Sequence, residues 1–89
     1  MSFKKDPNAV LDYSFDWAPY LAPLGDAIAS VVWIASAGLT LGAASSTGTT
    51  ATTFVLGGIA GNDETLTCRI TTAGGRTDDR TITLKITDR

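Results

Sequence analysis

Two alternating runs separated by a glycine-rich turn lie near the C-terminal end of this 89-residue chain: ETLTCRITT at 64–72, AGGR at 73–76 and TITLKIT at 81–87. In both runs an apolar side chain recurs at every second residue, which is typical of a strand with one buried face. Glycine accepts the positive φ of a tight turn, so the segment predicts a β-hairpin. The positions expected to face the core are Leu66, Cys68, Ile70, Ile82, Leu84 and Ile86.

The N-terminal half extends the strand pattern. Residues 11–17 alternate large apolar with polar side chains and predict a first strand, with Phe15 and Trp17 in the core. Two prolines and a glycine between 18 and 25 exclude a long helix or a central strand there. Residues 26–35 are rich in β-branched side chains and predict a second strand. Its expected core face carries Ala29, Val31 and Trp33.

Two more strands are expected before the hairpin. A turn at 37–38 precedes a short strand over 39–41, and the small polar residues 42–49 predict a loop. Residues 50–56 predict a fourth strand with Thr52, Phe54 and Leu56 facing inward. Six or seven short strands without a helical period indicate an all-β, antiparallel β-sandwich, and the length fits an immunoglobulin-like domain. The sandwich is expected over 11–89, preceded by an N-terminal arm over 1–10.

Composition excludes several function classes. Histidine is absent and Cys68 is the single cysteine, so neither a Ser-His-Asp triad, nor a Cys-His zinc site, nor an intrachain disulfide can form. The net charge of −2 gives no basic excess for nucleic acid. The most apolar stretch, 28–44, reads as strands joined by a turn rather than as a membrane helix. We therefore expect no enzyme activity, no cofactor and no membrane span, and a protein made in the cytoplasm.

Three groups of side chains are candidates for a site. Asp63-Glu64 with Asp78-Asp79 resembles a calcium cluster, but the acids lie on two separate turns, which favours solvated carboxylates paired with Arg76 and Arg80. Asp12 and Asp16 are expected on the outward face of the first strand. The aromatic residues form either a sugar-stacking platform or a core. They are Tyr13, Trp17, Tyr20 and Trp33, of which Tyr20 is the best candidate for exposure.

The joined pattern is more specific than the fold class. It comprises DPNAVLDY at 6–13, Asp16-Trp17, Trp33 with AGLT at 37–40, and RITTAGGRTDDR at 69–80. This pattern resembles a family of short proteins of tailed bacteriophages, described as fiber–tail adaptor or neck proteins. One departure is Glu64, which stands where the family more often has an aromatic residue.

The resemblance implies a non-enzymatic structural virion protein that joins the neck or tail to fibers or to neighbouring tail components. Its partners would be other virion proteins, with several copies of the chain in a symmetric ring. Because the resemblance begins at Asp6, we expect the N-terminal arm to be ordered in the particle. The residues expected at the interface are Lys4, Lys5, Asp6, Pro7, Asn8 and Tyr20. The alternative is a carbohydrate-binding or adhesion module of immunoglobulin-like fold.

Overall fold

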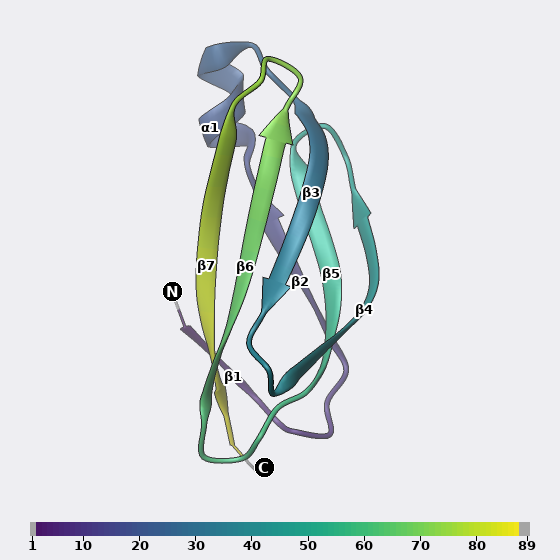
Figure 1. Cartoon of the computed structure of the whole chain (residues 1–89), viewed down its shortest axis with the longest axis vertical. Helices are drawn as coiled ribbons and strands as arrows, with labels where there is room; N and C mark the ends of the chain where they lie inside the picture. The colour runs from purple at the N-terminus through teal and green to yellow at the C-terminus, as the bar shows by residue number, and fades with distance from the viewer. Residues whose placement is uncertain (1, 88–89) are drawn as a thin grey trace.

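The computed structural model describes residues 2–87 and contains two β-sheets packed face to face (Figure 1). The predicted all-β sandwich is thereby confirmed. One short helical segment, α1 (Ala18–Leu21) with the 3-10 turn η1 (Ala22–Leu24), interrupts the strands where the prolines lie. The strands are β1 (Ser2–Lys5), β2 (Leu11–Asp16), β3 (Ile28–Ala35), β4 (Leu39–Ser46), β5 (Thr50–Gly57), β6 (Asp63–Thr72) and β7 (Thr77–Ile86).

The two sheets differ in size. One has four strands in the order β1-β7-β6-β3, and the other has three in the order β2-β5-β4. Neighbouring strands run antiparallel except β1 and β7, which run parallel. The turn 73–76 and α1 lie at one end of the sandwich, here called the hairpin end, and Lys5 lies toward the other, here called the Lys5 end (Figure 1). The immunoglobulin-like connectivity stays a prediction.

Residues 2–5, which were expected in an arm outside the sandwich, form the edge strand β1. Ser2 lies opposite Thr83 and Lys5 lies opposite Ile86, so β1 covers only the C-terminal half of β7. The Phe3 ring packs against Tyr13 of the other sheet with ring centroids 5.6 Å apart. The start of the chain thus bridges the two layers.

The hairpin strands supply half of the buried apolar residues, on the face expected from their alternation. Trp17 and Leu21 close the core at the hairpin end, while Phe15 packs against Trp33 at a centroid distance of 5.6 Å. Trp33 itself is half-buried at the margin of the sandwich. The buried apolar residues are Phe15, Trp17, Leu21, Leu39, Ala51, Val55, Leu66, Cys68, Ile70, Ile82, Leu84 and Ile86.

The expected orientation of residues 50–56 is wrong by one residue. Ala51, Thr53 and Val55 are buried, and Phe54 is 41% exposed on the outer face of β5. The pairing with β2 places Phe15 opposite Ala51 and Tyr13 opposite Thr53. Small β5 side chains therefore lie beside the aromatic residues of β2, because close packing requires large and small groups to interdigitate. The hydrophobicity of one strand alone does not predict how its side chains must pack against a neighbouring strand.

A register shift between Ile28 and Ser30 also changes the expected face of β3. Ala29 is exposed, whereas Ile28 packs against the core together with Val31 and Trp33. A bulge inserts one extra residue, so residues on its two sides no longer follow one alternation. Beyond the bulge, Val32 and Ile34 point outward and are 52% and 42% exposed.

Two predicted loops are strands. Residues 42–46 continue β4, and 77–80 are the first residues of β7, where Cys68 lies opposite Arg80 and Ile70 lies opposite Asp78. Polar composition suggested loops in both places. Ladder hydrogen bonds to a neighbouring strand hold the backbone extended whatever the side chains are, so composition alone underestimates strand length.

We predict that the hairpin turn depends on Gly75, the residue of this turn with positive φ (88°). Of the expected pair Gly74-Gly75, Gly74 does not need this conformation. Gly75→Ala should lower the free energy of unfolding by about 1–2 kcal/mol, because a β-carbon resists left-handed backbone. Urea denaturation followed by circular dichroism measures this, with Gly48→Ala as the control, since Gly48 lacks positive φ and a β-carbon there would make an ordinary contact with the Ala27 β-carbon at 3.9 Å. Equal stability of the two variants would refute the assignment.

Candidate docking surfaces

Lys5, expected at an interface, is instead fully buried. Its ammonium group donates to three backbone carbonyl oxygens, those of Ala9 at 2.6 Å, Gly57 at 2.7 Å and Asp6 at 3.0 Å. An ammonium has three N–H donors, so all of them are used. Burial lowers the pKa of Lys5, and the nearby Asp6 carboxylate opposes that shift. This arrangement, here called the Lys5 cage, joins β1 to the end of β5 and thus one sheet to the other.

The turn between β1 and β2 is ordered by its own polar groups. The Asp6 carboxylate accepts the Asn8 N–H at 2.8 Å, and the Asp6 carbonyl accepts the Ala9 N–H at 3.0 Å. Asn8 is exposed, and Asp6 and Pro7 are half-buried. Lys4 is exposed and lies beside Lys85 of β7. Of the expected interface residues in this segment, all but Lys5 thus reach the surface at the Lys5 end.

Tyr20, the other expected interface residue, is half-buried at the hairpin end. Its ring packs edge-on against Trp17 with centroids 5.8 Å apart. The Arg80 guanidinium covers the same indole, 4.3 Å from the ring centroid, and donates to the Asp16 carbonyl at 2.8 Å. A cation over an indole face is attracted by the ring quadrupole. Arg80 therefore stacks on the Trp17 ring instead of pairing with Asp78 or Asp79.

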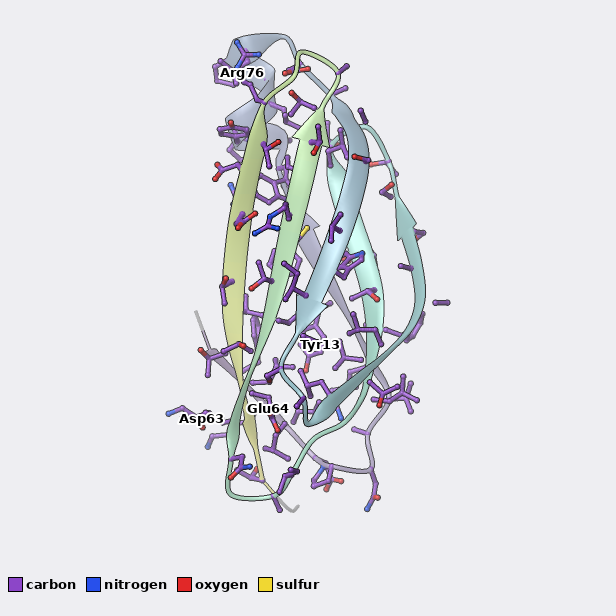
Figure 2. All side chains as sticks on the ribbon, in the orientation of Figure 1. Tyr13, Asp63, Glu64 and Arg76 are labelled. Carbon is purple, nitrogen blue, oxygen red and sulfur yellow. The ribbon has the colours of Figure 1, made fainter. Side chains whose placement is uncertain are left out.

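The acidic residues do not gather into a site. Asp63 and Glu64 begin β6 at the Lys5 end, whereas Asp78 and Asp79 lie opposite Ile70 and Arg69 (Figure 2). Within residues 2–87 no group of three or more His, Cys, Asp or Glu side chains is arranged to hold a metal ion. Asp79 pairs with Arg69 at 2.8 Å, not with Arg76 or Arg80 as expected, and that pairing lowers the pKa of Asp79. Asp12 and Asp16 are exposed on β2.

Glu64, where the resemblance predicts an aromatic residue, is buried. Its carboxylate accepts the Ser36 hydroxyl at 2.7 Å, and the Ser36 oxygen accepts the Thr65 N–H at 2.9 Å. Gly38 leaves the space that the carboxylate occupies, since a β-carbon there would collide with the Glu64 Oε2 atom. A hydrogen-bonded carboxylate thus packs this corner in place of an aromatic ring.

Asp26 ties the helical segment to the hairpin. Its carboxylate accepts the Arg76 guanidinium, the Gly74 N–H and the Ala27 N–H, each at about 3 Å. Figure 2 shows Arg76 at this hairpin end, beside α1. The Thr72 hydroxyl and these N–H groups lower the pKa of Asp26 from 3.8 to about 2. The carboxylate therefore stays ionised well below its ordinary range.

Two grooves open at the sides of the sandwich, where the sheets part. The larger, about 430 Å³, lies between β2 and β7 and is lined by Phe3, Tyr13, Phe15, Arg80, Ile82 and their neighbours. The smaller, about 190 Å³, lies between β3 and β4 beside Trp33, Ser45 and Ser46. The part of the chain that the structure describes contains no helix long and apolar enough to cross a membrane.

These features define a small β-sandwich whose polar side chains stabilise the fold and whose two sheets end in edge strands. Its family follows from comparison with known proteins. A family model described as "Podophage GP4 fiber-tail adaptor protein gp77" matches residues 5–85, and the chain belongs to this family of phage structural adaptors. No curated protein matches the chain. The match begins at Lys5, the residue of the cage.

We predict that Lys5→Met destabilises the fold by about 1–3 kcal/mol, because it leaves buried carbonyl oxygens without a donor. Lys4→Met is the matched control, since Lys4 is exposed one residue away. Removal of residues 1–5 should destabilise as well, although these residues were expected in an arm outside the sandwich. Thermal unfolding of the full chain and these variants measures the effect, and equal melting temperatures would overturn the structural role of the cage.

We predict a pH-dependent contribution from Asp26. Its folded-state pKa of about 2 lies below the ordinary 3.8, so the stabilisation is fully present above pH 3.8. It should be lost as the pH falls through about 2. Asp26→Asn should flatten the stability profile in this window, which acid titration followed by tryptophan fluorescence can measure. The exposed Asp12→Asn is the control. A profile unchanged by Asp26→Asn would contradict the role.

We predict that the Cys68 thiol resists labelling until the chain unfolds. The side chain is fully buried, and burial raises the pKa of the thiol although Trp17 and Arg80 oppose the rise. The burial of the side chain and the raised pKa both suppress formation of the reactive thiolate. Cys68→Ser should cost about 1–3 kcal/mol, because it buries a hydroxyl where most of the surrounding side chains are apolar. Labelling of the native protein as fast as that of the urea-unfolded protein would refute this packing.

Proposed function

We propose that this protein is a non-enzymatic component of the virion that links the tail of a podophage to its fibers. The observation that carries the proposal is the family match over residues 5–85, which spans the chain from the Lys5 cage into β7. Its place would be in the assembled particle, in several copies, with synthesis in the host cytoplasm. Its partners would be tail and fiber subunits.

The shape supports a linking role. The body measures 42 × 22 × 18 Å, and the two ends have different chemistry. The Lys5 end presents Lys4 beside Lys85 and the ordered turn over 6–9, while the hairpin end presents α1 and the turn over 73–76. Hydrogen bonds and ion pairs hold both ends in fixed conformations. A rigid body with two different ends can connect two different partners at a fixed spacing.

The contact that we propose for the Lys5 end uses charge. Lys4 and Lys85 lie opposite each other in the β1–β7 ladder and point to the same face. Together with the turn residues Asp6, Pro7 and Asn8 they form a surface that suits acidic groups of a neighbouring virion subunit. Lys5 supports this surface from beneath by fixing the turn.

The second candidate, a glycan-binding module, has one observation in its favour. The groove of about 190 Å³ is lined by Trp33 together with Ser45 and Ser46, and sugars bind through aromatic faces and hydroxyl partners. Phe15 packs against this indole on the core side. A glycan binder would retain sugar as an isolated protein, whereas an adaptor requires its virion partners.

The test is complementation of a phage that lacks the gene. Particles that receive the wild-type chain should carry it at fixed stoichiometry and carry fibers. We expect Lys4→Glu with Lys85→Glu to reduce fiber-bearing particles at least tenfold without altering the fold. Arg69→Glu with Asp79→Arg is the control, since it exchanges the two charges of an exposed ion pair on the same sheet, near the hairpin end, and keeps opposite charges facing each other. Normal fibers on particles devoid of the chain would overturn the proposal, and glycan binding by the isolated chain would favour the second candidate.

A further inference from the structure

The charges of this protein are strongly segregated along the chain. Every Asp, Glu, Lys and Arg lies before residue 27 or after residue 62. The uncharged stretch folds into β3, β4 and β5, of which β5 is a central strand. The other two, β3 and β4, are edge strands of the two sheets and lie on the same side of the sandwich, at the right in Figure 1. One lateral side of the molecule therefore has two strand edges without a single charge.

Exposed strand edges normally carry devices against pairing with another chain. Charged side chains, prolines and bulges are the common ones. The opposite side of this sandwich follows the rule, with Lys4 on β1, Asp12 and Asp16 on β2, and Asp78 to Arg80 on the uncovered half of β7. Neither β3 nor β4 contains a charge or a proline.

Bulges distinguish the two uncharged edges. The register of β4 shifts in its middle, between Leu41 and Ala44, which breaks the regular backbone that a new strand would need. The shift in β3 lies at its start, between Ile28 and Ser30, so residues 30–35 pair with β6 in unbroken register. On this regular segment Val32 and Ile34 are 52% and 42% exposed. The edge of β3 is thus both regular and apolar.

Charge also indicates what covers this edge. In a two-fold symmetric contact each residue near the axis meets its own copy, so a charged edge repels itself and an uncharged one does not. Antiparallel pairing of β3 with β3 of a second copy, with the axis at Val32, would place the two Val32 side chains opposite each other and each Ile34 opposite Ser30 of the other copy. It would also join the two four-stranded sheets into one. Of the edges in residues 2–87, β3 meets this requirement over a regular, apolar stretch.

We propose that the β3 edge is a self-association surface, through which two copies of this chain pair antiparallel about a two-fold axis near the middle of β3. The proposal goes beyond the adaptor role and does not depend on it. A pair of this kind would double the number of sites that one adaptor unit offers to tail or fiber subunits.

Sedimentation of the isolated full chain tests the proposal. The wild type should show a concentration-dependent monomer–dimer equilibrium. Val32→Lys should raise the dissociation constant at least about a hundredfold, because it sets like charges against each other across the axis. Val10→Lys is the matched control: Val10 is the same residue type at 57% exposure, next to the β2 edge on the other side. It should leave the dissociation constant unchanged, and circular dichroism verifies the fold of both variants.

A second measurement uses only the wild type. Deuterium uptake of residues 28–35 should fall as the protein concentration rises, while uptake of the other edge strand, residues 11–16, should stay constant. A monomer at every concentration would overturn the proposal, as would a dimer that Val32→Lys leaves intact. Protection of β3 that appears only in assembled particles would assign the edge to a different virion protein and would overturn it too.

Discussion

The buried ammonium of Lys5 is the interaction on which the two-layer arrangement depends most directly. It is bound by carbonyl oxygens from the turn after β1 and from the end of β5, so one cation fixes the N-terminal strand, the turn and the second sheet together. Burying a charge without hydrogen-bond partners costs much free energy of folding. The three carbonyl groups must therefore stay in place while the lysine is charged. The Thr87 N–H donates to the Lys5 carbonyl and thereby adds the end of β7 to the same junction.

A second polar junction stabilises the opposite end. Asp26 holds the turn over 73–76 through Gly74 and Arg76, and Arg80 covers the Trp17 indole. Between the two ends the core is apolar, with Cys68 as a small buried side chain. The ionised groups at these junctions thus fix the two ends of the sandwich. This division suits a protein whose proposed role is to hold partners at a defined spacing.

The exposed surfaces that could contact partners differ in charge from one side of the molecule to another. The Lys5 end offers paired lysines, the side with β2 and β7 offers a groove between charged strands, and the side with β3 and β4 offers uncharged edges. An adaptor of the proposed kind would contact unlike neighbours and, in several copies, also itself. Electrostatic differences among its faces would keep these contacts from competing, because charged faces favour complementary partners while an uncharged edge tolerates its own copy.

The sequence by itself determined the fold class, the hairpin and the family resemblance. Strict alternation in β6 and β7 leaves only one face apolar, so Leu66, Cys68 and Ile70 could be assigned without coordinates. Where both faces are apolar, only the tertiary structure decided: Phe54 points out because β2 places aromatic side chains opposite the small residues of β5. Lys5 was expected at an interface with a neighbouring subunit, and only the fold brings distant Gly57 to its ammonium group. Bulges and long-range carbonyl contacts depend on strand pairing, which a local pattern of residues does not encode.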